Sequence, residues 1–482
     1  MSQFRPSHFN FVFPVREGEL LYNTYSGAAI LLAGSDVADL AATLVDSRQH
    51  VDLECLPESV FSDLLDGGFL APLQADEVKG IRDRYWTARR KTPMVLTITT
   101  TMDCNLGCYY CYEERSTAKL ESGDVPTLVE FARARLRTNS RSRLHVSWYG
   151  GEPLLNATFM ETASLALQEM CMRENVEYVA SIISNGTRWP VNVGEFVALH
   201  QLKQTQISFD GMQRHHDKRR RYRSKAVAKS VSSFEVICSL VDKLVHHTNV
   251  DIRFNLDSTN KGDLIPFFEF AGKRGWLSAP FPATIQIARV SAYTDHAKFI
   301  RKVEISDREF DELRAGVRSL FGTVAKVQES EIPSGFPSPK TSVCAALAFD
   351  SAVIGADKQT YRCGLQVSER HRATGALQGS SFKGIPISTG PTHSHQYRDA
   401  EWWATFDPTT LPTCKLCSFL PICWAGCPKK FLDDDQHAIL EQGSYWRRNL
   451  PRLVANGLGY QLREDTQVSE AHQFRERPGL NQ

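Results

Sequence analysis

The stretch Thr101-Met102-Asp103-Cys104-Asn105-Leu106-Gly107-Cys108-Tyr109-Tyr110-Cys111-Tyr112-Glu113 spaces three cysteines as C-x3-C-x2-C, directly after the apolar run Met94–Thr100. Three thiolates this close in one loop are able to wrap one face of a cubane iron–sulfur cluster and leave one of its four irons open. A zinc site is the alternative, but zinc loops usually pair two C-x2-C units, and no second pair lies nearby. The spacing therefore favours a cluster whose open iron can bind a substrate.

Apolar runs of strand length alternate with helical patterns from residue 93 to about residue 290. The runs are Met94–Thr100, Leu144–Tyr149, Tyr178–Ser184, Gln206–Phe209, Asp251–Leu256 and Thr284–Val290. The helical patterns between them are Thr127–Thr138, Ala157–Arg173, Val193–His200, Ala226–His246 and Asp263–Gly272. This alternation is typical of an α/β fold with a parallel sheet or a barrel-like array of strands. In such folds the chemistry takes place at the carboxyl ends of the strands.

The rest of the chain predicts a division into four parts. Residues 1–88 contain two β-prone stretches, Phe9–Val15 and Leu20–Leu32, then helical patterns at Val37–Asp46 and Pro57–Asp66, with Asp76–Lys91 as a helical linker. The core is 89–335. Residues 336–445 form a loop-rich part that needs a metal as its source of order. Residues 446–482 form a C-terminal helix and a polar tail.

The composition is that of an ordinary globular protein. The 482 residues are 42% hydrophobic and 23% charged, with a formal net charge of +1, which argues against a nucleic-acid or membrane-surface partner bound by bulk charge. No apolar run approaches the roughly 20 residues of a membrane span, and the N-terminus lacks a signal-peptide layout. We therefore expect a cytoplasmic protein, whose twelve cysteines serve as metal ligands, catalytic groups or buried thiols and not as disulfides.

Further motifs follow the ends of the next three strands. The second strand ends in Tyr149-Gly150-Gly151-Glu152-Pro153, where glycines allow close backbone approach and a carboxylate complements an ammonium group. The third ends in Ser184-Asn185-Gly186-Thr187. The fourth ends in Ser208-Phe209-Asp210-Gly211 and runs into His215-His216-Asp217 and Arg219. A solvated face is favoured for Arg220, Arg221 and Arg223, and a metal-ligand role is disfavoured for both histidines.

In this order after successive strands, the motifs resemble those of the radical S-adenosylmethionine (SAM) superfamily. The resemblance implies a partial (β/α)6 barrel in which Cys104, Cys108 and Cys111 hold a [4Fe-4S] cluster. Its open iron would chelate the amino and carboxylate groups of SAM, and one electron would cleave the sulfonium to give methionine and a 5′-deoxyadenosyl radical. That radical would abstract a hydrogen atom from the substrate.

The same resemblance suggests which residues contact SAM. Tyr110 matches the position beside the adenine, and the segment Gly150, Gly151 and Glu152 matches the one that receives the amino group. Ser184 and Asn185 match the ribose-contacting segment. Ser208, Asp210 and Arg219 match the motif in which serine and arginine contact the carboxylate, since arginine can grip a carboxylate bidentately. No other side chain can be given a catalytic role from the sequence.

A second group of cysteines lies near the C-terminus. The pattern Cys414-x2-Cys417-x5-Cys423-x3-Cys427, preceded by Cys344 and Cys363, resembles the SPASM extension of radical enzymes that modify peptides and proteins. The resemblance implies one or two auxiliary [4Fe-4S] clusters, one held by Cys344, Cys363 and Cys427 and the other by Cys414, Cys417 and Cys423. The fullest family pattern has further cysteines, which this chain lacks, so each cluster has three apparent thiolates.

Two questions about these ligands stay open. The first auxiliary cluster either has an open iron or takes a fourth ligand from elsewhere, for example from the substrate. A fourth ligand for the second auxiliary cluster is a candidate role for Asp433, Asp434, Asp435 or His437, and a polar turn is the alternative for the acidic run. The isolated Cys55, Cys171 and Cys238 are predicted to be buried, inert thiols.

The leading functional hypothesis is a maturase of a ribosomally made precursor peptide. The N-terminal part resembles in layout the winged-helix-like domains that bind leader peptides, where a leader is able to add as a strand; a domain that merely caps the barrel is the alternative. A reductant such as flavodoxin or ferredoxin would supply electrons. The product would be a crosslink or a similar oxidative modification, with the auxiliary clusters as electron acceptors.

Two alternatives remain. A sulfatase-maturating enzyme that makes formylglycine resembles this chain, but that class uses an aspartate just after the cysteine that corresponds to Cys363, and Gly364 stands here. From another class, a non-catalytic electron carrier or zinc-organised module would have no use for the strand-end motifs around Glu152 and Asp210.

Overall fold

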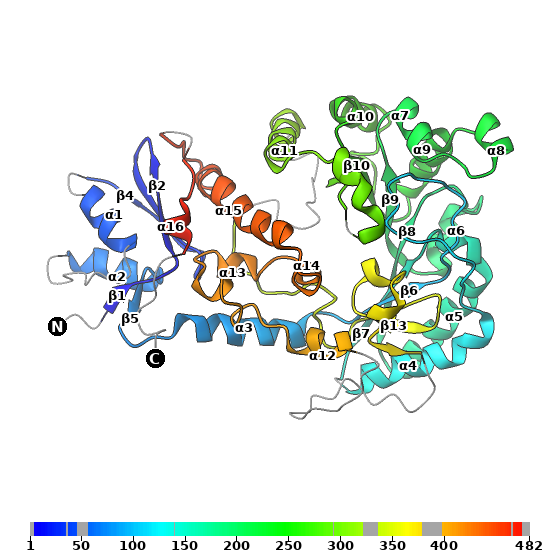
Figure 1. Cartoon of the computed structure of the whole chain (residues 1–482), viewed down its shortest axis with the longest axis horizontal. Coiled ribbons are helices and arrows are strands. Elements are labelled where there is room, and N and C mark those ends of the chain that lie inside the picture. Colours follow the sequence, from blue (N-terminus) through cyan, green and yellow to red (C-terminus); the bar gives the residue numbers. More distant parts are fainter. Residues whose placement is uncertain are drawn as a thin grey trace. The chain divides into compact units, whose positions relative to one another are not determined.

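The computed structural model of the chain describes residues 4–34, 37–45, 56–138, 140–292, 294–321, 336–377, 398–463 and 466–474 (Figure 1). They fall into two compact units. The first unit comprises Met1–Lys91, Pro333–Cys344 and Thr405–Gln482, and the second comprises Thr92–Ile332 and Ala345–Ala404. The division of the chain into four functional parts remains a prediction.

The second unit is built on a central sheet whose main part is parallel. Its six parallel strands are adjacent in chain order: β6 (Val95–Thr99), β7 (Arg143–Tyr149), β8 (Glu177–Ser184), β9 (Leu202–Phe209), β10 (Asn249–Leu256) and β11 (Thr284–Arg289). All six predicted strands are thereby confirmed, as is the α/β class. Because the strands are parallel, their carboxyl ends lie along one edge.

Helices connect these strands largely as the sequence predicts, but α7 was not predicted and one predicted helix is broken. The helices of the unit are α4 (Val125–Thr138), α5 (Ala157–Arg173), α6 (Val193–Leu199), α7 (Gln213–Arg219), α8 (Lys225–Ser230), α9 (Ser233–Leu244), α10 (Leu264–Lys273) and α11 (Asp307–Phe321). The single helix predicted over Ala226–His246 is wrong. It is broken into α8 and α9, because Ser232 is extended and its hydroxyl accepts a hydrogen bond from the Glu235 N–H as an N-cap.

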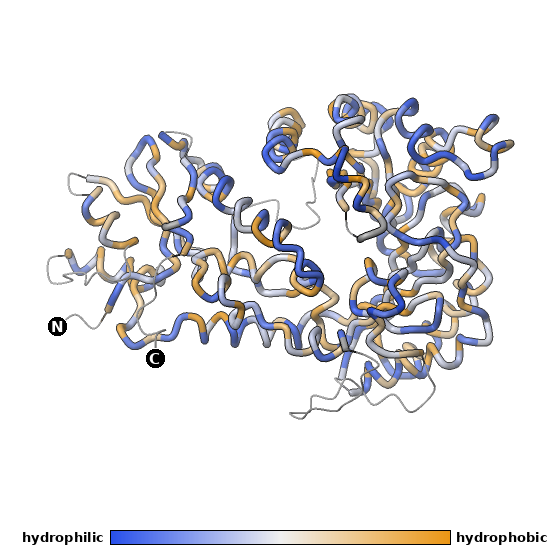
Figure 2. Tube along the Cα trace, in the orientation of Figure 1, coloured by the Kyte–Doolittle hydropathy of each residue, from blue (hydrophilic) through white to orange (hydrophobic). Residues whose placement is uncertain are grey.

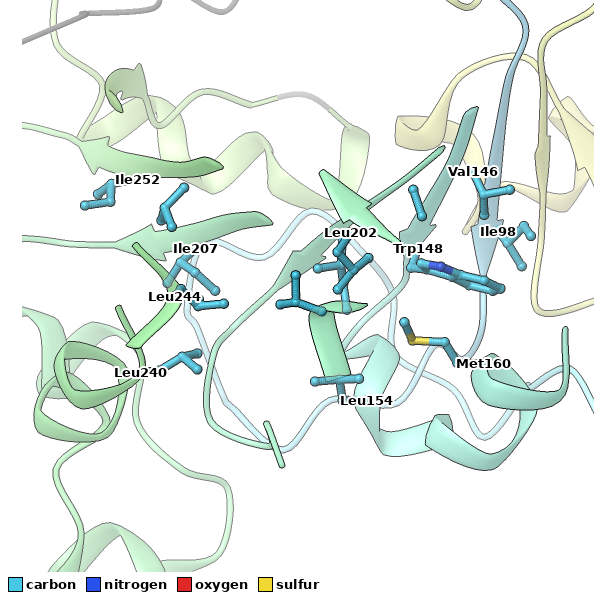
Figure 3. Close-up of a cluster of buried hydrophobic side chains, with 14 of the residues drawn as sticks. Ile98, Val146, Trp148, Leu154, Met160, Leu202, Ile207, Leu240, Leu244 and Ile252 are labelled. Atoms are coloured by element: carbon cyan, nitrogen blue, oxygen red, sulfur yellow. The ribbon is translucent and has the colours of Figure 1, made fainter. Parts of the chain in front are cut away.

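The core of this unit lies between the sheet and its helices. Fully buried side chains from one face of the strands, such as Ile98 and Trp148, pack against the helices. Figure 3 shows Trp148 beside Met160 of α5, and Ile207 beside Leu244 of α9. The alternate strand residues face the other way, and many of them are polar. The apolar face of the sheet therefore packs against the helices, and the opposite face carries the polar side chains that are able to take part in chemistry.

Three short strands extend the sheet beyond β6. They are β12 (Ala352–Ile354), β13 (Gln359–Tyr361) and β14 (Gly375–Ala376), and β12 pairs in parallel with β6. The sequence did not predict them because two or three residues give no visible alternation. Single turns of 3-10 helix occur at Ser122–Asp124, Pro153–Asn156, Lys261–Asp263, Gly364–Gln366, Arg370–Arg372 and Cys414–Leu416, and a longer one at Asp295–Lys302.

The first unit combines small antiparallel sheets with helices. Its strands are β1 (Phe4–Pro6), β2 (Asn10–Val15), β3 (Gly18–Asn23), β4 (Ala29–Leu32) and β5 (Leu70–Pro72), with β1 paired to β5 and the order β2-β3-β4 in the other sheet. Its helices are α1 (Val37–Val45), α2 (Glu58–Asp66), α3 (Glu77–Lys91), α13 (Leu420–Cys423), α14 (Pro428–Leu432), α15 (Gln436–Gly457) and α16 (Glu470–Gln473); α12 (Arg398–Thr405) spans the boundary between the units in sequence.

Most of the predicted elements of the N-terminal part are confirmed. The helical patterns become α1, α2 and α3, and Figure 2 shows the mixture of hydrophobic and hydrophilic residues along α3. The stretch Leu20–Leu32 is two strands and not one. Asn23 accepts hydrogen bonds from the N–H groups of Tyr25 and Ser26, which turns the chain between β3 and β4.

Within the described ranges, no helix is both long and apolar enough to cross a membrane.

Candidate functional site

The cysteine loop that follows β6 is fastened on both sides by backbone contacts. On one side Gly151 N–H donates to the Thr101 carbonyl and Glu152 N–H to the Asp103 carbonyl, at 3.0 and 2.9 Å. On the other side Leu106 forms an isolated β-bridge with Tyr222. The loop therefore has a fixed backbone although it contains no regular secondary structure.

The three thiols of this loop lie close enough to interact electrostatically. Burial raises the pKa of Cys104 to about 11 and that of Cys111 to about 12, and Cys108 adds to both effects. Thiols with such high pKa values are protonated at neutral pH, so metal binding must displace protons. Among the cysteines that the structure describes, none forms a disulfide.

The residues of this loop are of the kind that an iron–sulfur cluster uses. Three cysteine side chains lie close together in one loop, and each thiolate of such a set binds its own iron. A donor also reaches the thiols: the Asn185 amide lies 3.5 Å from the Cys104 sulfur. This donor set fits an iron–sulfur cluster.

The two glycines after β7 let the second strand end approach the cysteine loop. Gly150 has φ +136°, and a side chain there would overlap the Thr101 carbonyl oxygen. A side chain at Gly151 would overlap the carbonyl of Asp103. These glycines therefore allow the backbone after β7 to contact the backbone of the cysteine loop, and they also leave room for a ligand.

Glu152 is enclosed, and its carboxylate is held by its own chain. It accepts hydrogen bonds from the Ser184 hydroxyl at 3.0 Å, the Asn185 N–H at 2.7 Å and the Leu154 N–H at 3.2 Å. The side chain is fully buried. Burial raises its pKa from the ordinary 4.5 to about 7, because an enclosed carboxylate loses its hydration. Glu152 thus ties the end of β7 to the end of β8.

The third strand end reaches back to the cysteine loop. The Asn185 amide donates to the side-chain oxygen of Asn105 at 2.9 Å, and Asn105 donates to the Thr187 hydroxyl at 2.8 Å. Gly186, which lies between Asn185 and Thr187 in the chain, has φ +80°, a backbone conformation that favours glycine. The structure therefore brings Ser184 and Asn185 next to the loop of Cys104.

The fourth and fifth strand ends form a buried network of charges. Arg219 donates to Asp210 at 3.0 Å and to Asp257 at 2.6 Å, and all three side chains are at most 4% exposed. Tyr110 donates its hydroxyl to Asp210 at 2.7 Å. Arg219 is therefore balanced by two carboxylates. Asp257, which the sequence did not single out, is the residue that completes this balance.

Arg220 corrects the sequence interpretation. It was assigned to a solvated face, but it is 7% exposed and donates to the Tyr110 hydroxyl at 2.7 Å. It also interacts electrostatically with Cys108, and its buried Nε has no hydrogen-bond partner. The solvated interpretation is confirmed for Arg221 and Arg223, which are exposed. The sequence of this basic run does not show which arginine is buried, because the direction of each side chain depends on where α7 ends.

The other residues of the fourth strand motif have separate positions. Ser208 lies on β9 in register with Arg253 of β10. His216 is fully buried and accepts a hydrogen bond from the Asp210 N–H at 3.3 Å, while His215 pairs with Asp263 at 2.7 Å. His216 thus fixes the backbone at the strand end.

The C-terminal cysteines divide between the two units. Cys344 and the quartet belong to the first unit, and Cys363 belongs to the second. Burial raises the pKa of Cys414, and both Cys417 and Cys423 add to this shift, so these three thiols lie together. The Gln473 amide donates to the Cys417 sulfur at 3.3 Å. The set expected for the second auxiliary cluster is thus brought together within one unit.

The acidic run beyond the quartet has structural partners. Asp433 pairs with Lys429, and Asp435 caps α15 by accepting from the Ala438 N–H at 3.1 Å. Asp434, whose own φ is +53°, accepts a hydrogen bond from the side-chain amide of Gln436. The His437 side chain is 82% exposed. These contacts favour the polar-turn interpretation over a ligand role.

The isolated cysteines were predicted to be buried. This is confirmed for Cys171 and Cys238, which are 1% and 3% exposed. Cys55 lies outside the described residues.

Comparison with known proteins agrees with this site. Residues 98–263 match the family model of the Radical SAM superfamily. The serine-type anaerobic sulfatase-maturating enzymes of Klebsiella pneumoniae and Klebsiella aerogenes are each 31% identical over 86 residues, or 17% of this chain. The match covers 22% and 21% of those enzymes, about a fifth of the length of these curated relatives.

Two solved structures share the fold at low identity. Native anSMEcpe with bound AdoMet and Cp18Cys peptide has a TM-score of 0.53 and 14% identity, over 76% of this chain and 99% of that one. Streptococcus suis SuiB bound to precursor peptide SuiA has a TM-score of 0.51 and 13% identity, over 89% and 97%. The cysteine loop and the strand ends lie within the matched region of the family.

Proposed function

Since residues 98–263 belong to the Radical SAM superfamily, we propose that the chain is a radical SAM enzyme that oxidatively modifies a ribosomally made precursor peptide. The observation that carries the proposal is that three half-buried thiols lie beside the ends of β7, β8 and β9. When bound, the cluster and SAM supply a 5′-deoxyadenosyl radical that removes a hydrogen atom from the substrate. The chain's own residues hold and orient these groups.

The cluster ligands in this proposal are Cys104, Cys108 and Cys111. Their thiolates would carry negative charge into a buried site, and Arg220 beside Cys108 offsets part of it. The amide of Asn185 adds a hydrogen-bond donor to the Cys104 sulfur. Donors of this kind tune the reduction potential of a cluster.

Arg220 is the better candidate to hold the carboxylate of SAM. Each guanidinium has one buried nitrogen without a hydrogen-bond partner, but Arg219 is balanced by two carboxylates at 3.0 and 2.6 Å, whereas Arg220 has only Asp210 among the described residues, at 3.7 Å. A buried donor without a partner costs about 1–3 kcal/mol, and an incoming carboxylate would remove that cost. Tyr110 and Ser208 keep the roles suggested by the resemblance, and Glu152 acts by positioning Ser184 and Asn185.

The C-terminal cysteines would hold the auxiliary clusters. Cys414, Cys417 and Cys423 would bind one of them, and Cys344, Cys363 and Cys427 the other. These clusters would accept the electron that the substrate radical releases when it is oxidised. A flavodoxin or ferredoxin would supply electrons to the first cluster, and we propose the cytoplasm as the location, where thiols stay reduced.

The substrate proposal rests on a strand edge in the first unit. In the sheet order β2-β3-β4, strand β4 (Ala29–Leu32) lies at an edge, and an extended leader peptide is able to add there as a further strand. SuiB, which shares the fold, was solved with a precursor peptide. A leader bound at β4 would raise the local concentration of the reacting segment.

Formylglycine formation is the second candidate. The match to two sulfatase-maturating enzymes favours it, although it spans only 86 residues. Against it stands Gly364 after Cys363, where that class uses an aspartate. A side chain at Gly364 would first meet the ring of Tyr149 at 3.7 Å, so this position borders the strand end that carries Gly150 and Gly151.

The test is anaerobic reconstitution followed by reduction with dithionite. We expect 5′-deoxyadenosine from the wild type and none from Cys108→Ala, because that variant lacks a cluster ligand. Co-expression with a short peptide gene adjacent on the chromosome, followed by tandem mass spectrometry, identifies the modification. A two-hydrogen mass loss with fragments that join two residues supports crosslinking. The same loss confined to one Ser, or the replacement of the sulfur of one Cys by an aldehyde oxygen, is formylglycine and supports the second candidate. Wild-type protein that binds iron yet forms no 5′-deoxyadenosine would refute both.

A further inference from the structure

A cleft of about 440 Å³ opens beside the cysteine loop of the second unit. Its walls include Cys104 and Asn105 of the loop, Thr187 and Arg188 after β8, and Arg223 and Val227 near α8. Cys104, unlike Cys108 and Cys111, lines this cleft. The cleft therefore gives a partner molecule its approach to one ligand of the proposed cluster.

The segment that borders the cleft is tied directly to the cysteine loop. Gly107 N–H donates to the Arg221 carbonyl at 2.8 Å, and Arg223 N–H donates to the Asn105 carbonyl at 2.9 Å. Leu106 and Tyr222 form the bridge between these two hydrogen bonds. Any molecule that binds this segment is thus held at a fixed position relative to Cys104.

The cleft has a basic rim, which we define as Arg188, Arg221, Arg223, Lys225 and Lys229. All of these residues are exposed. Of the cleft-lining residues, Asp103 is the acidic one, and it pairs with Arg223 at 2.8 Å. Both of these side chains are about half exposed, so their ion pair contributes little and the rim stays positive.

Helix α8 (Lys225–Ser230) carries the two lysines of the rim and buries none of its residues. Helices in proteins are normally stabilised by burying an apolar face, and α8 instead exposes Val227, which is 37% accessible. Val231, just beyond the helix, is 40% accessible. In Figure 1 α8 lies at the outer edge of the second unit. Exposed valines between lysines are suited to a small, transient protein interface.

We propose that the cleft and its basic rim form the docking site for the acidic electron-carrier protein that reduces the cluster. This inference rests on the proposed function, because it needs a cluster at Cys104. One electron leaves the reduced carrier and enters the oxidised cluster, and no bond forms or breaks. A positive rim around a cleft steers a negative partner and raises its association rate by about 10-fold or more at low salt.

The test measures cluster reduction by a reduced flavodoxin of net negative charge, followed by stopped-flow absorbance. The charge-reversed variant K225E/K229E is compared with the wild type at low and at high ionic strength. We expect the second-order rate constant to fall about tenfold at low salt, and its salt dependence to weaken. The neutral variant K225Q/K229Q should lie between the two.

A matched control makes the same charge change elsewhere in the unit. K203E/K243E alters two exposed lysines, Lys203 at the amino end of β9 and Lys243 in the last turn of α9. Its rate should stay within twofold of the wild type. Equal rates for K225E/K229E and the wild type, or an equal loss in the control, would overturn the docking proposal.

Reduction by dithionite separates this outcome from a failure of the proposed function. Every variant should keep the wild-type iron content and the wild-type yield of 5′-deoxyadenosine with dithionite, since none of these lysines is among the residues proposed to hold the cluster or SAM. If the wild type itself shows no dithionite-reducible cluster, the proposed function fails. If dithionite reduces the cluster but charge reversal does not change the rate of reduction by flavodoxin, the proposed function stands and the proposed docking site is wrong.

Discussion

The two cysteine-rich regions of this chain are held in place by different means. The loop of Cys104 is fastened to the ends of parallel strands, with Glu152 and Asn185 as connectors. The loop that contains Cys417 is supported by helices and the C-terminal segment, where Ser418 N–H donates to the Gln473 carbonyl at 2.9 Å. A rigid sheet edge positions the first set of thiols, and the local packing of short helices positions the second. The first region should therefore tolerate change less well.

Loss of a cysteine is expected to have the largest effect, and to differ between the regions. Cys108→Ser should abolish 5′-deoxyadenosine formation, because it removes a ligand of the cluster that binds SAM. Cys414→Ser should lower the iron content by about four atoms per chain and keep 5′-deoxyadenosine formation. Iron assays and chromatography of the products check both. If Cys414→Ser also abolishes cofactor cleavage, the two regions do not act independently.

Glycine substitutions test the rigidity of the two loops. An added methyl at Gly150 overlaps the backbone oxygen of Thr101, whereas one at Gly426 overlaps the side chain of Gln442, which is able to turn away with the loss of its hydrogen bond from the Cys427 N–H. We expect Gly150→Ala to destabilise its loop by at least about 3 kcal/mol and Gly426→Ala by about 1–2 kcal/mol. Hydrogen exchange of the amides in each loop measures these changes, and equal losses would contradict the difference in rigidity.

The pH dependence of stability should also differ. Glu152 accepts the Asn185 N–H in the first region, while the neutral Gln442 accepts the Cys427 N–H in the second. Burial raises the pKa of Glu152 from 4.5 to about 7, so between these values the folded state binds more protons than the unfolded state. Stability should therefore fall as the pH rises through this window, by about 3 kcal/mol at most.

Urea unfolding of the metal-free protein between pH 4.5 and 7.5 measures this slope. Glu152→Gln should remove its contribution, because an amide does not titrate in this range. Gln442→Leu is the matched change in the second region and should leave the slope unaltered. If the pH dependence of stability persists in Glu152→Gln, it arises from other titrating groups.

The smallest expected effect concerns the donors to sulfur. Asn185 donates to Cys104 and Gln473 to Cys417, at 3.5 and 3.3 Å. Because such hydrogen bonds stabilise the reduced, more negative cluster, Asn185→Leu and Gln473→Leu should each lower the reduction potential of the adjacent cluster alone. Redox titration followed by electron paramagnetic resonance separates the two potentials. A shift of both clusters by one substitution would contradict independent tuning.

Much of the core could be predicted from the sequence because its signals are local. The six parallel strands bury apolar residues mainly at alternate positions, and the spacing of Cys104, Cys108 and Cys111 lies within one loop. Short elements gave weaker signals: β12 (Ala352–Ile354) has too few residues to alternate, and the break between α8 and α9 depends on the single cap Ser232. Residues 336–377 illustrate the limit, since a stretch that looked like loop contributes strands to the central sheet.

The sequence by itself determined the strands, the cysteine spacings and the glycines at the strand ends, since each of these depends on neighbours only a few residues away. Tertiary structure alone decided that Arg220 turns inward while Arg221 and Arg223 stay exposed, that Asp257 balances Arg219, and that Gln473 reaches Cys417. These pairings join residues as far apart as 56 positions, and burial together with the need to compensate buried charge selects them only after the chain has folded.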